Sequence, residues 1–352
     1  MSKFWSPDVR ELTPYVPGEQ PRERLIKLNT NENPYPPAPG VEQVLRDYPV
    51  DHLRLYPDPD ALALREALAR EHGVEAEQVF VGNGSDEVLA LAFQTFFRQP
   101  RPLLMPGITY SFYPVYCRLY DIAYRTVALD DHWQVPLDAL SGDNGGVIFA
   151  NPNAPTGHGH PREAIARLLA RVTDSVVLID EAYVDFGGES SVPLVAAHPN
   201  LLVVGTFSKS RSLAGLRIGY AIGSRELIEG LERVKNSFNS YPLDSLAIAA
   251  GVAALDDREH FDACREHVIA TRERTRRRLV ELGFEVLPSQ TNFLLARHEG
   301  HDAGELFTGL RERGILVRHF NSEALHDFLR ISIGTDDEMD SLIEALEALC
   351  RG

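Results

Sequence analysis

The spacing of apolar residues along the chain predicts alternating strands and helices up to about residue 240. Residues 78–97 read as a short strand, a glycine turn and an apolar helix, and residues 161–172 have helical spacing. Further short runs that predict strands lie at 101–107, 123–130, 145–157, 175–183 and 200–210. Buried strands that alternate with helices indicate an α/β fold with a mostly parallel central sheet between helices. Ligands then belong at the carboxyl ends of the strands.

The pattern changes after about residue 240, where long helical stretches precede a few strands. Helices are predicted at 243–255, 258–282 and 302–313 and from Asp336, and strands within 284–297, 314–320 and 328–334. The first forty residues are rich in proline and asparagine, which favours an extended arm. We therefore predict an arm over residues 1–40 that packs on the small domain or a partner subunit, a large domain over 41–240 and a small α+β domain over 241–352.

Composition narrows the class of protein. The 352 residues are 44% hydrophobic, contain no apolar run of membrane-spanning length and begin without signal-peptide features, so we expect a cytoplasmic protein without membrane contact. The three cysteines lie far apart and suggest neither disulfides nor a metal pair. A formal net charge of -16 opposes nucleic-acid binding. His158 and His160 lie on a glycine loop that we expect to be exposed, and we predict no metal site.

One lysine follows a buried strand where its charge would be costly. Lys209 stands in "TFSKS", and a desolvated lysine is the amine that forms Schiff bases. Nearby, Thr206, Ser208 and Arg217 offer hydroxyls and a guanidinium suited to a phosphate. Asp180 ends another strand, where burial would neutralise it unless it had a cationic partner, although a helix N-cap is an equal alternative for this residue alone.

Two loops add to this picture. In "VGNGSDE", the backbone amides of Gly84, Ser85 and Asp86 could hold a phosphate at the start of a helix, although the glycine spacing matches no nucleotide fingerprint. "NPNAPTG" presents two asparagines and could also be a plain surface turn. A Schiff-base lysine, a phosphate cup and a buried aspartate for a pyridinium nitrogen together match the requirements of pyridoxal phosphate.

The motifs "LNTNENPY", "GNGSDE", "NPNAPTG", "VLIDEAYVDF" and "TFSKSRSLAGLRIGY", in this order, resemble the fold-type I pyridoxal-phosphate-dependent aminotransferases. The resemblance is strongest to the histidinol-phosphate aminotransferase family of class II and extends from Leu12 to the motif "LRISIGT". It implies a large cofactor-binding domain and a smaller domain, and pyridoxal 5'-phosphate as the cofactor.

The resemblance also implies roles for individual residues. Lys209 would hold the cofactor as a Schiff base and move the substrate proton, Asp180 would pair with the ring nitrogen, and Tyr183 would bond the phenolate oxygen. Tyr110 would stack on the ring. The phosphate would be bound by Gly84, Ser85, Asp86, Thr206, Ser208 and Arg217. Tyr56 would reach the cofactor phosphate of the neighbouring subunit, which implies a homodimer with composite active sites.

The sequence departs from the family at one position. The family usually has a second asparagine before the proline, which contacts the phenolate oxygen, and here that position is Ala154. Either Asn153 turns inward to replace it, which we favour, or Tyr183 serves alone.

On the substrate side, the resemblance implies that Arg330 binds the α-carboxylate of glutamate. Arg318 and Tyr15 would bind the phosphate of histidinol phosphate, and Asn292 would shape the site.

The expected reaction is transfer of the amino group between L-histidinol phosphate and 2-oxoglutarate, giving imidazole-acetol phosphate and glutamate, in histidine biosynthesis. Two alternatives remain, an aromatic or broad-range aminotransferase and a lyase similar to threonine-phosphate decarboxylase. A regulator built on this fold would need an additional DNA-binding domain, for which the chain leaves no room.

Overall fold

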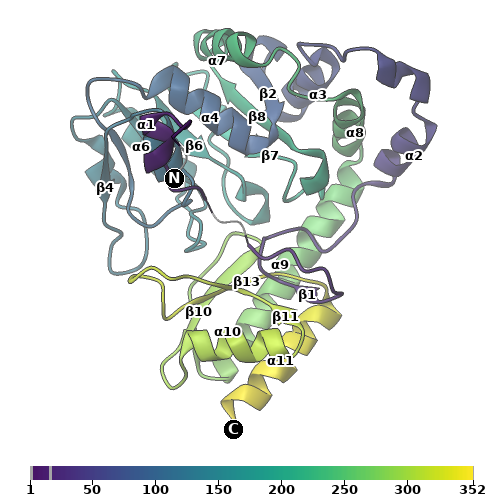
Figure 1. Cartoon of the computed structure of the whole chain (residues 1–352), viewed down its shortest axis with the longest axis vertical. Helices are drawn as coiled ribbons and strands as arrows, with labels where there is room; N and C mark the ends of the chain where they lie inside the picture. The colour runs from purple at the N-terminus through teal and green to yellow at the C-terminus, as the bar shows by residue number, and fades with distance from the viewer. Residues whose placement is uncertain (1–2, 16–17, 352) are drawn as a thin grey trace.

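A seven-stranded sheet forms the centre of the larger part of the molecule in the computed structural model, which describes residues 3–15 and 18–351 (Figure 1). The strand order is β2 (Val79–Asn83), β8 (Ile218–Gly223), β7 (Leu201–Thr206), β6 (Val177–Asp180), β5 (Gly146–Ala150), β3 (Leu103–Pro106) and β4 (Tyr124–Val127). Only β8 runs antiparallel to its neighbours, so the predicted mostly parallel sheet is confirmed. β8 was not expected as a separate strand.

Helices cover both faces of this sheet because its central strands are apolar on both sides. Alternate residues of β5, β6 and β7 enter two separate cores. One face is covered by α2 (Pro39–Asp47), α3 (Leu62–His72), α6 (Arg162–Leu169) and α8 (Ser245–Asp256). The other is covered by α4 (Gly84–Phe96), α5 (Tyr113–Leu119) and α7 (Arg225–Phe238). None of the helices within residues 3–15 and 18–351 is long and apolar enough to cross a membrane.

The smaller part of the molecule lies below the large sheet in Figure 1 and has a core of its own. Its antiparallel sheet has the order β12 (Arg318–His319), β13 (Leu329–Ser332), β10 (Phe293–His298) and β9 (Phe284–Val286). Its helices are α9 (Arg258–Glu281), α10 (Ala303–Glu312) and α11 (Asp336–Cys350). Thr335 and Glu338 form a capping box that fixes the start of α11.

The N-terminal arm is mostly extended and contributes one strand to a separate two-stranded sheet. It contains the short helix α1 (Pro7–Glu11) and β1 (Ile26–Lys27), which pairs in parallel with β11 (Ile315–Leu316). Leu28 enters the core of the small part. The division of the chain at residues 40 and 240 stays a prediction. Because α8 packs on α2 and α3, the boundary between the large and the small domain is better placed within α9 than at residue 240.

Candidate active site

Neighbouring parallel strands deliver polar side chains to one edge of the large sheet. β5, β6 and β7 are adjacent, and Asp180 at the end of β6 lies in register with Val204 of β7. Asn153 follows β5, and Lys209 follows β7. The turn at Gly84 starts α4 at the end of β2. Asn153, Asp180, Lys209 and Gly84 therefore lie at the carboxyl ends of the strands, as expected for an α/β sheet.

Asp180 is a buried carboxylate with one hydroxyl partner. Its Oδ2 accepts a hydrogen bond of 2.8 Å from the Tyr113 hydroxyl, and its Oδ1 accepts one of 3.1 Å from the amide of Ala182. Burial raises the pKa of Asp180 to about 6, while these bonds act in the opposite direction. No lysine or arginine in the described part of the chain forms an ion pair with it, so a cationic ligand group would be well placed here.

The Lys209 amine lies between the two parts of the molecule. Its Nζ donates a hydrogen bond of 3.2 Å to the carbonyl of Thr30 in the arm and lies 5.7 Å from the centroid of the Tyr183 ring. The Asn33 amide donates to the carbonyl of Lys209 at 3.1 Å. The lysine loop is held further by Arg211, which pairs with Glu71 at 2.7 Å. The lysine is thus presented by a fixed backbone, and no carboxylate of the described residues is bound to its amine.

Two tyrosines border the same space. The Tyr183 hydroxyl accepts a hydrogen bond of 2.9 Å from the Asn31 amide. The Tyr110 hydroxyl donates to Asp86 at 2.9 Å, and the Tyr110 ring meets that of Tyr113 edge to face at 5.5 Å. Burial raises the pKa of Tyr110, so this ring stays neutral and can cover an aromatic ligand.

The predicted phosphate cup forms around Arg217. This residue lies in the left-handed region, with φ of 53°, and directs its guanidinium at Asp86, 3.2 Å away, and at the hydroxyl of Ser208, 3.5 Å away. A side chain at Gly84 would overlap the guanidinium. The Thr206 hydroxyl donates to the Ile218 carbonyl and accepts from the Ser208 amide, so it shapes the loop. Ser85 remains half-buried at the first turn of α4.

Asn153 does not present a donor to the site. It is 1% exposed, and its Nδ2 already donates to the Ile108 carbonyl at 3.0 Å and to Thr156 at 3.2 Å. Both amide protons are therefore used, and the Oδ1 acceptor has no partner among the described residues. Because a phenolate oxygen needs a donor, this geometry disfavours the expectation that Asn153 replaces the missing asparagine at Ala154, and it favours Tyr183 alone.

Two arginines lie side by side at the edge of the small sheet. Arg318 of β12 and Arg330 of β13 are direct cross-strand partners, so their side chains share one face. Arg330 donates to the carbonyl of Asn29 at 2.9 Å, and its Nε is buried with no partner in the described part of the chain. Burial lowers the pKa of Arg330, and Arg318 adds to this effect. Neither arginine has a carboxylate partner in residues 3–15 and 18–351, which leaves two cations available for anions.

The other predicted substrate residues contact α5 and the arm. The Tyr15 ring packs on Phe112 at 4.9 Å. Asn292 is fully buried and donates to the carbonyl of Asn31 at 3.0 Å, and its Oδ1 has no partner within residues 3–15 and 18–351.

Tyr56 lies apart from the other predicted residues. It is 81% exposed and stacks on Tyr241 at 4.7 Å. In the described chain it has no hydrogen bond to another predicted site residue, so its predicted role in the neighbouring subunit's site stays a prediction.

The residue set fits pyridoxal phosphate. The buried Asp180 carboxylate suits a protonated ring nitrogen, and the Arg217 cup at the start of α4 suits a phosphate. Lys209 lies close enough to Tyr183 for both to meet one ligand. Tyr113 and Asn31, which hold Asp180 and Tyr183, were missed in the sequence. The signals for them were the run of aromatics around Tyr113 and the motif "LNTNENPY", in which Asn31 stands.

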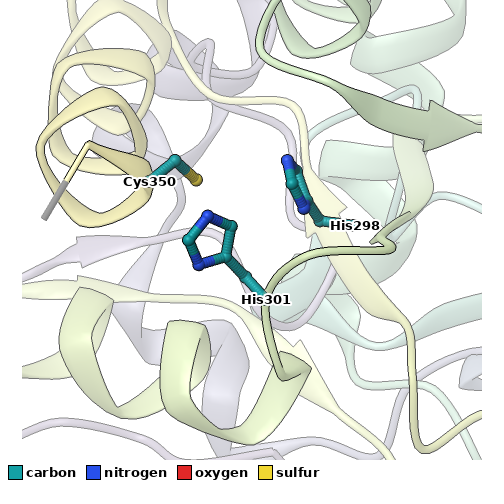
Figure 2. A group of neighbouring side chains, drawn as sticks. All are labelled: His298, His301 and Cys350. Atoms are coloured by element: carbon teal, nitrogen blue, oxygen red, sulfur yellow. The ribbon is translucent and has the colours of Figure 1, made fainter.

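Three possible metal ligands lie together in the small part of the molecule. His298, His301 and Cys350 have ligand atoms within 4.8 Å of one another and face one another in Figure 2. However, Nδ1 of His298 accepts from the Gly300 amide at 3.0 Å, and its Nε2 lies 3.2 Å from the Leu282 carbonyl. A metal would have to displace one of these bonds.

We expected the loop at His158 and His160 to be exposed, but it is partly buried. Both side chains are half-buried, and burial lowers the pKa of each histidine.

Comparisons with known proteins agree with this geometry. The model of the family "Aminotransferase class I and II" matches residues 23–346. The histidinol-phosphate aminotransferase of Chromohalobacter salexigens is 79% identical over 351 residues, which cover 100% of both chains. Histidinol-phosphate aminotransferase 1 of Methylococcus capsulatus is 58% identical over 353 residues, covering 100% of this chain and 99% of that protein. The solved histidinol-phosphate aminotransferase of Sinorhizobium meliloti in complex with pyridoxal-5'-phosphate has a TM-score of 0.90 and 26% identity, covering 100% of this chain and 98% of that one.

Proposed function

The chain belongs to the class I and II aminotransferases, which use pyridoxal phosphate, and we propose that it transfers the amino group between L-histidinol phosphate and 2-oxoglutarate. The products are imidazole-acetol phosphate and glutamate, and the reaction belongs to histidine biosynthesis. This proposal rests on the relatives of that name and on the arginine pair at the site.

The single observation that carries the substrate proposal is the pairing of Arg318 with Arg330. Like charges directly opposite each other on neighbouring strands destabilise a sheet, so an unneutralised pair calls for anionic ligands. A bidentate guanidinium suits the carboxylate of glutamate at Arg330, and Arg318 with Tyr15 suits a phosphate. Asn292 fixes the backbone of the arm beside them.

We assign the chemistry to the residues of the large domain. When bound, pyridoxal phosphate supplies an electron-withdrawing ring that stabilises negative charge on the substrate α-carbon. Lys209 holds the cofactor and then, at Nζ, accepts and returns the α-proton. Asp180 keeps the ring nitrogen protonated, and Tyr183 donates to the phenolate oxygen.

The phosphate is bound by Ser208, Arg217 and the first turn of α4, while Tyr110 covers the ring. The α4 amides come from residues 84–86.

Half-reactions of the holoenzyme test the substrate. Each amine is mixed with the enzyme in the absence of a 2-oxo acid, and the visible absorbance of the bound cofactor is followed. Histidinol phosphate and glutamate should each discharge this absorbance. Rapid reaction of phenylalanine without histidinol phosphate would indicate the aromatic enzyme, and carbon dioxide release from threonine phosphate would indicate the lyase. Lys209→Ala should lack both the absorbance and turnover.

We also propose a homodimer with composite sites. Exposed apolar side chains gather around Tyr56, on residues 45–62 and at Phe238 and Tyr241, a surface that water does not favour. A second copy placed there would bring Tyr56 toward the partner's phosphate cup. A cytoplasmic location stays a prediction.

A further inference from the structure

Residues 29–33 of the arm connect the groups to which we assign the chemistry. The carbonyl of Asn29 accepts from Arg330, and the carbonyl of Thr30 accepts from the Lys209 amine. The Asn33 amide donates to the backbone of the lysine loop. Asn31 lies at the centre of this segment and is the residue that reaches Tyr183.

All hydrogen-bonding groups of Asn31 have partners. Its backbone amide donates to the Ser332 hydroxyl at 2.8 Å, and its carbonyl accepts from Asn292 at 3.0 Å. The Ser332 hydroxyl donates to Oδ1 of Asn31 at 2.8 Å, and Nδ2 donates to the Tyr183 hydroxyl at 2.9 Å. Asn31 is 1% exposed and has φ of 56°, a left-handed conformation that asparagine tolerates better than most residues.

This network assigns a direction to the Tyr183 hydroxyl. Because the Ser332 proton occupies Oδ1 of Asn31, the amide side of Asn31 faces Tyr183 and the tyrosine oxygen is an acceptor there. The phenol proton is then free to be donated elsewhere. The ring itself is held by Phe293, which it meets edge to face at 5.1 Å. If the Asn31 amide were turned over, it would accept the phenol proton and remove it from the site.

We propose that Asn31 is a positioning residue that, anchored by Ser332, directs the Tyr183 proton toward the phenolate oxygen of bound pyridoxal phosphate. This inference rests on the role proposed above for Tyr183. It gains weight because both amide protons of Asn153 are used elsewhere, which leaves Tyr183 as the donor on this side. A hydrogen bond to an anion is about twice as strong as one between neutral groups. The direction of the Tyr183 proton therefore affects how well the phenolate form of the cofactor is stabilised.

The test is the pH titration of the visible absorbance of the holoenzyme. A donor to the phenolate oxygen favours the form that has lost the imine proton, so losing the donor should raise the titration midpoint. Asn31→Asp keeps the shape and the Ser332 anchor but accepts the phenol proton. We expect this variant and Tyr183→Phe each to raise the midpoint by about one pH unit, from the strength of a charge-assisted bond. Each variant, prepared without cofactor, should also bind pyridoxal phosphate more weakly than the parent protein does.

The double variant separates the mechanism from a simple charge effect. In the Tyr183→Phe background, Asn31→Asp should add much less than it does alone, because the effect passes through the tyrosine. Fully additive shifts would overturn the inference. A shift in Tyr183→Phe with none in Asn31→Asp would also overturn it while leaving the role of Tyr183 intact. No shift in Tyr183→Phe would overturn that role and the inference together.

Two further variants keep the test decisive if the Asn31 variants misfold. Ser332→Ala removes the anchor and should shift the midpoint in the same direction, so an unchanged midpoint there counts against the inference even if the Asn31 variants do not fold. Asn144→Ala is the matched control, because Asn144 is also buried, at 3% exposure, and bonds backbone groups at the opposite end of β5. It should lower the thermal stability without moving the midpoint.

Discussion

Replacement of Gly84 by alanine should weaken cofactor binding through Arg217. Gly84 has φ of 77°, and its added Cβ would overlap the Arg217 guanidinium. The backbone strain costs roughly 1–2 kcal/mol of stability. Displacement of the guanidinium removes a charge-assisted bond to the phosphate worth about 1.5–3 kcal/mol. The dissociation constant of pyridoxal phosphate should therefore rise roughly 10- to 100-fold.

Gly73 provides a control with the same backbone strain. It ends α3 with φ of 69°, and no atom lies within 4 Å of the Cβ that alanine would add. Gly73→Ala and Gly84→Ala should therefore lose similar stability in urea unfolding, whereas only Gly84→Ala should bind the cofactor weakly. The assay is titration of the cofactor-free proteins with pyridoxal phosphate, followed by quenching of protein fluorescence. Equal affinities in the two variants would refute the proposed function of Arg217.

Three other outcomes follow from the site. Hybrid dimers reassembled from equal amounts of Lys209→Ala and Tyr56→Ala subunits should regain about a quarter of the activity, because one site of each mixed dimer is intact; no gain would contradict a shared site. Arg318→Gln should raise the KM for histidinol phosphate roughly 10- to 100-fold, with a smaller change for glutamate in steady-state kinetics. Equal changes would contradict a phosphate role.

In cofactor-free Tyr113→Phe, the pKa of Asp180 should rise beyond about 6 because the carboxylate loses its hydroxyl donor. The folded state then binds a proton that the unfolded chain has already released, so this group's contribution makes unfolding easier as pH rises from about 4 to above 6. The free energy of unfolding, measured with urea across this range, should decline over more of the pH range for the variant than for the parent protein.

The central strands β5, β6 and β7 could be predicted because each is a continuous apolar run, buried on both faces, that ends in a polar loop. β8 was missed because it follows Arg217 directly and contains two glycines. The polar residues that follow these strands, such as Asp180 and Lys209, could be predicted as well, because they stand where the apolar runs end. Asn31 stands in the motif "LNTNENPY", but its role and that of Tyr113 could not be predicted because their partners lie 152 and 67 residues away in the chain. The direction of the hydrogen bonds of Asn153 likewise depends on Ile108, and no local sequence pattern connects these two residues.

The hydrogen bonds between the arm and β13 determine when the site can form during synthesis. Asn31 bonds Ser332, and Asn29 bonds Arg330, each across 301 residues of chain. The arm therefore leaves the ribosome first but acquires these partners only after β13 has emerged, when nearly the whole chain has been made. Until then Tyr183 and the Lys209 amine lack their contacts with the arm. A nascent or prematurely terminated chain can form the apolar cores of the large sheet, but it cannot hold these two side chains in place.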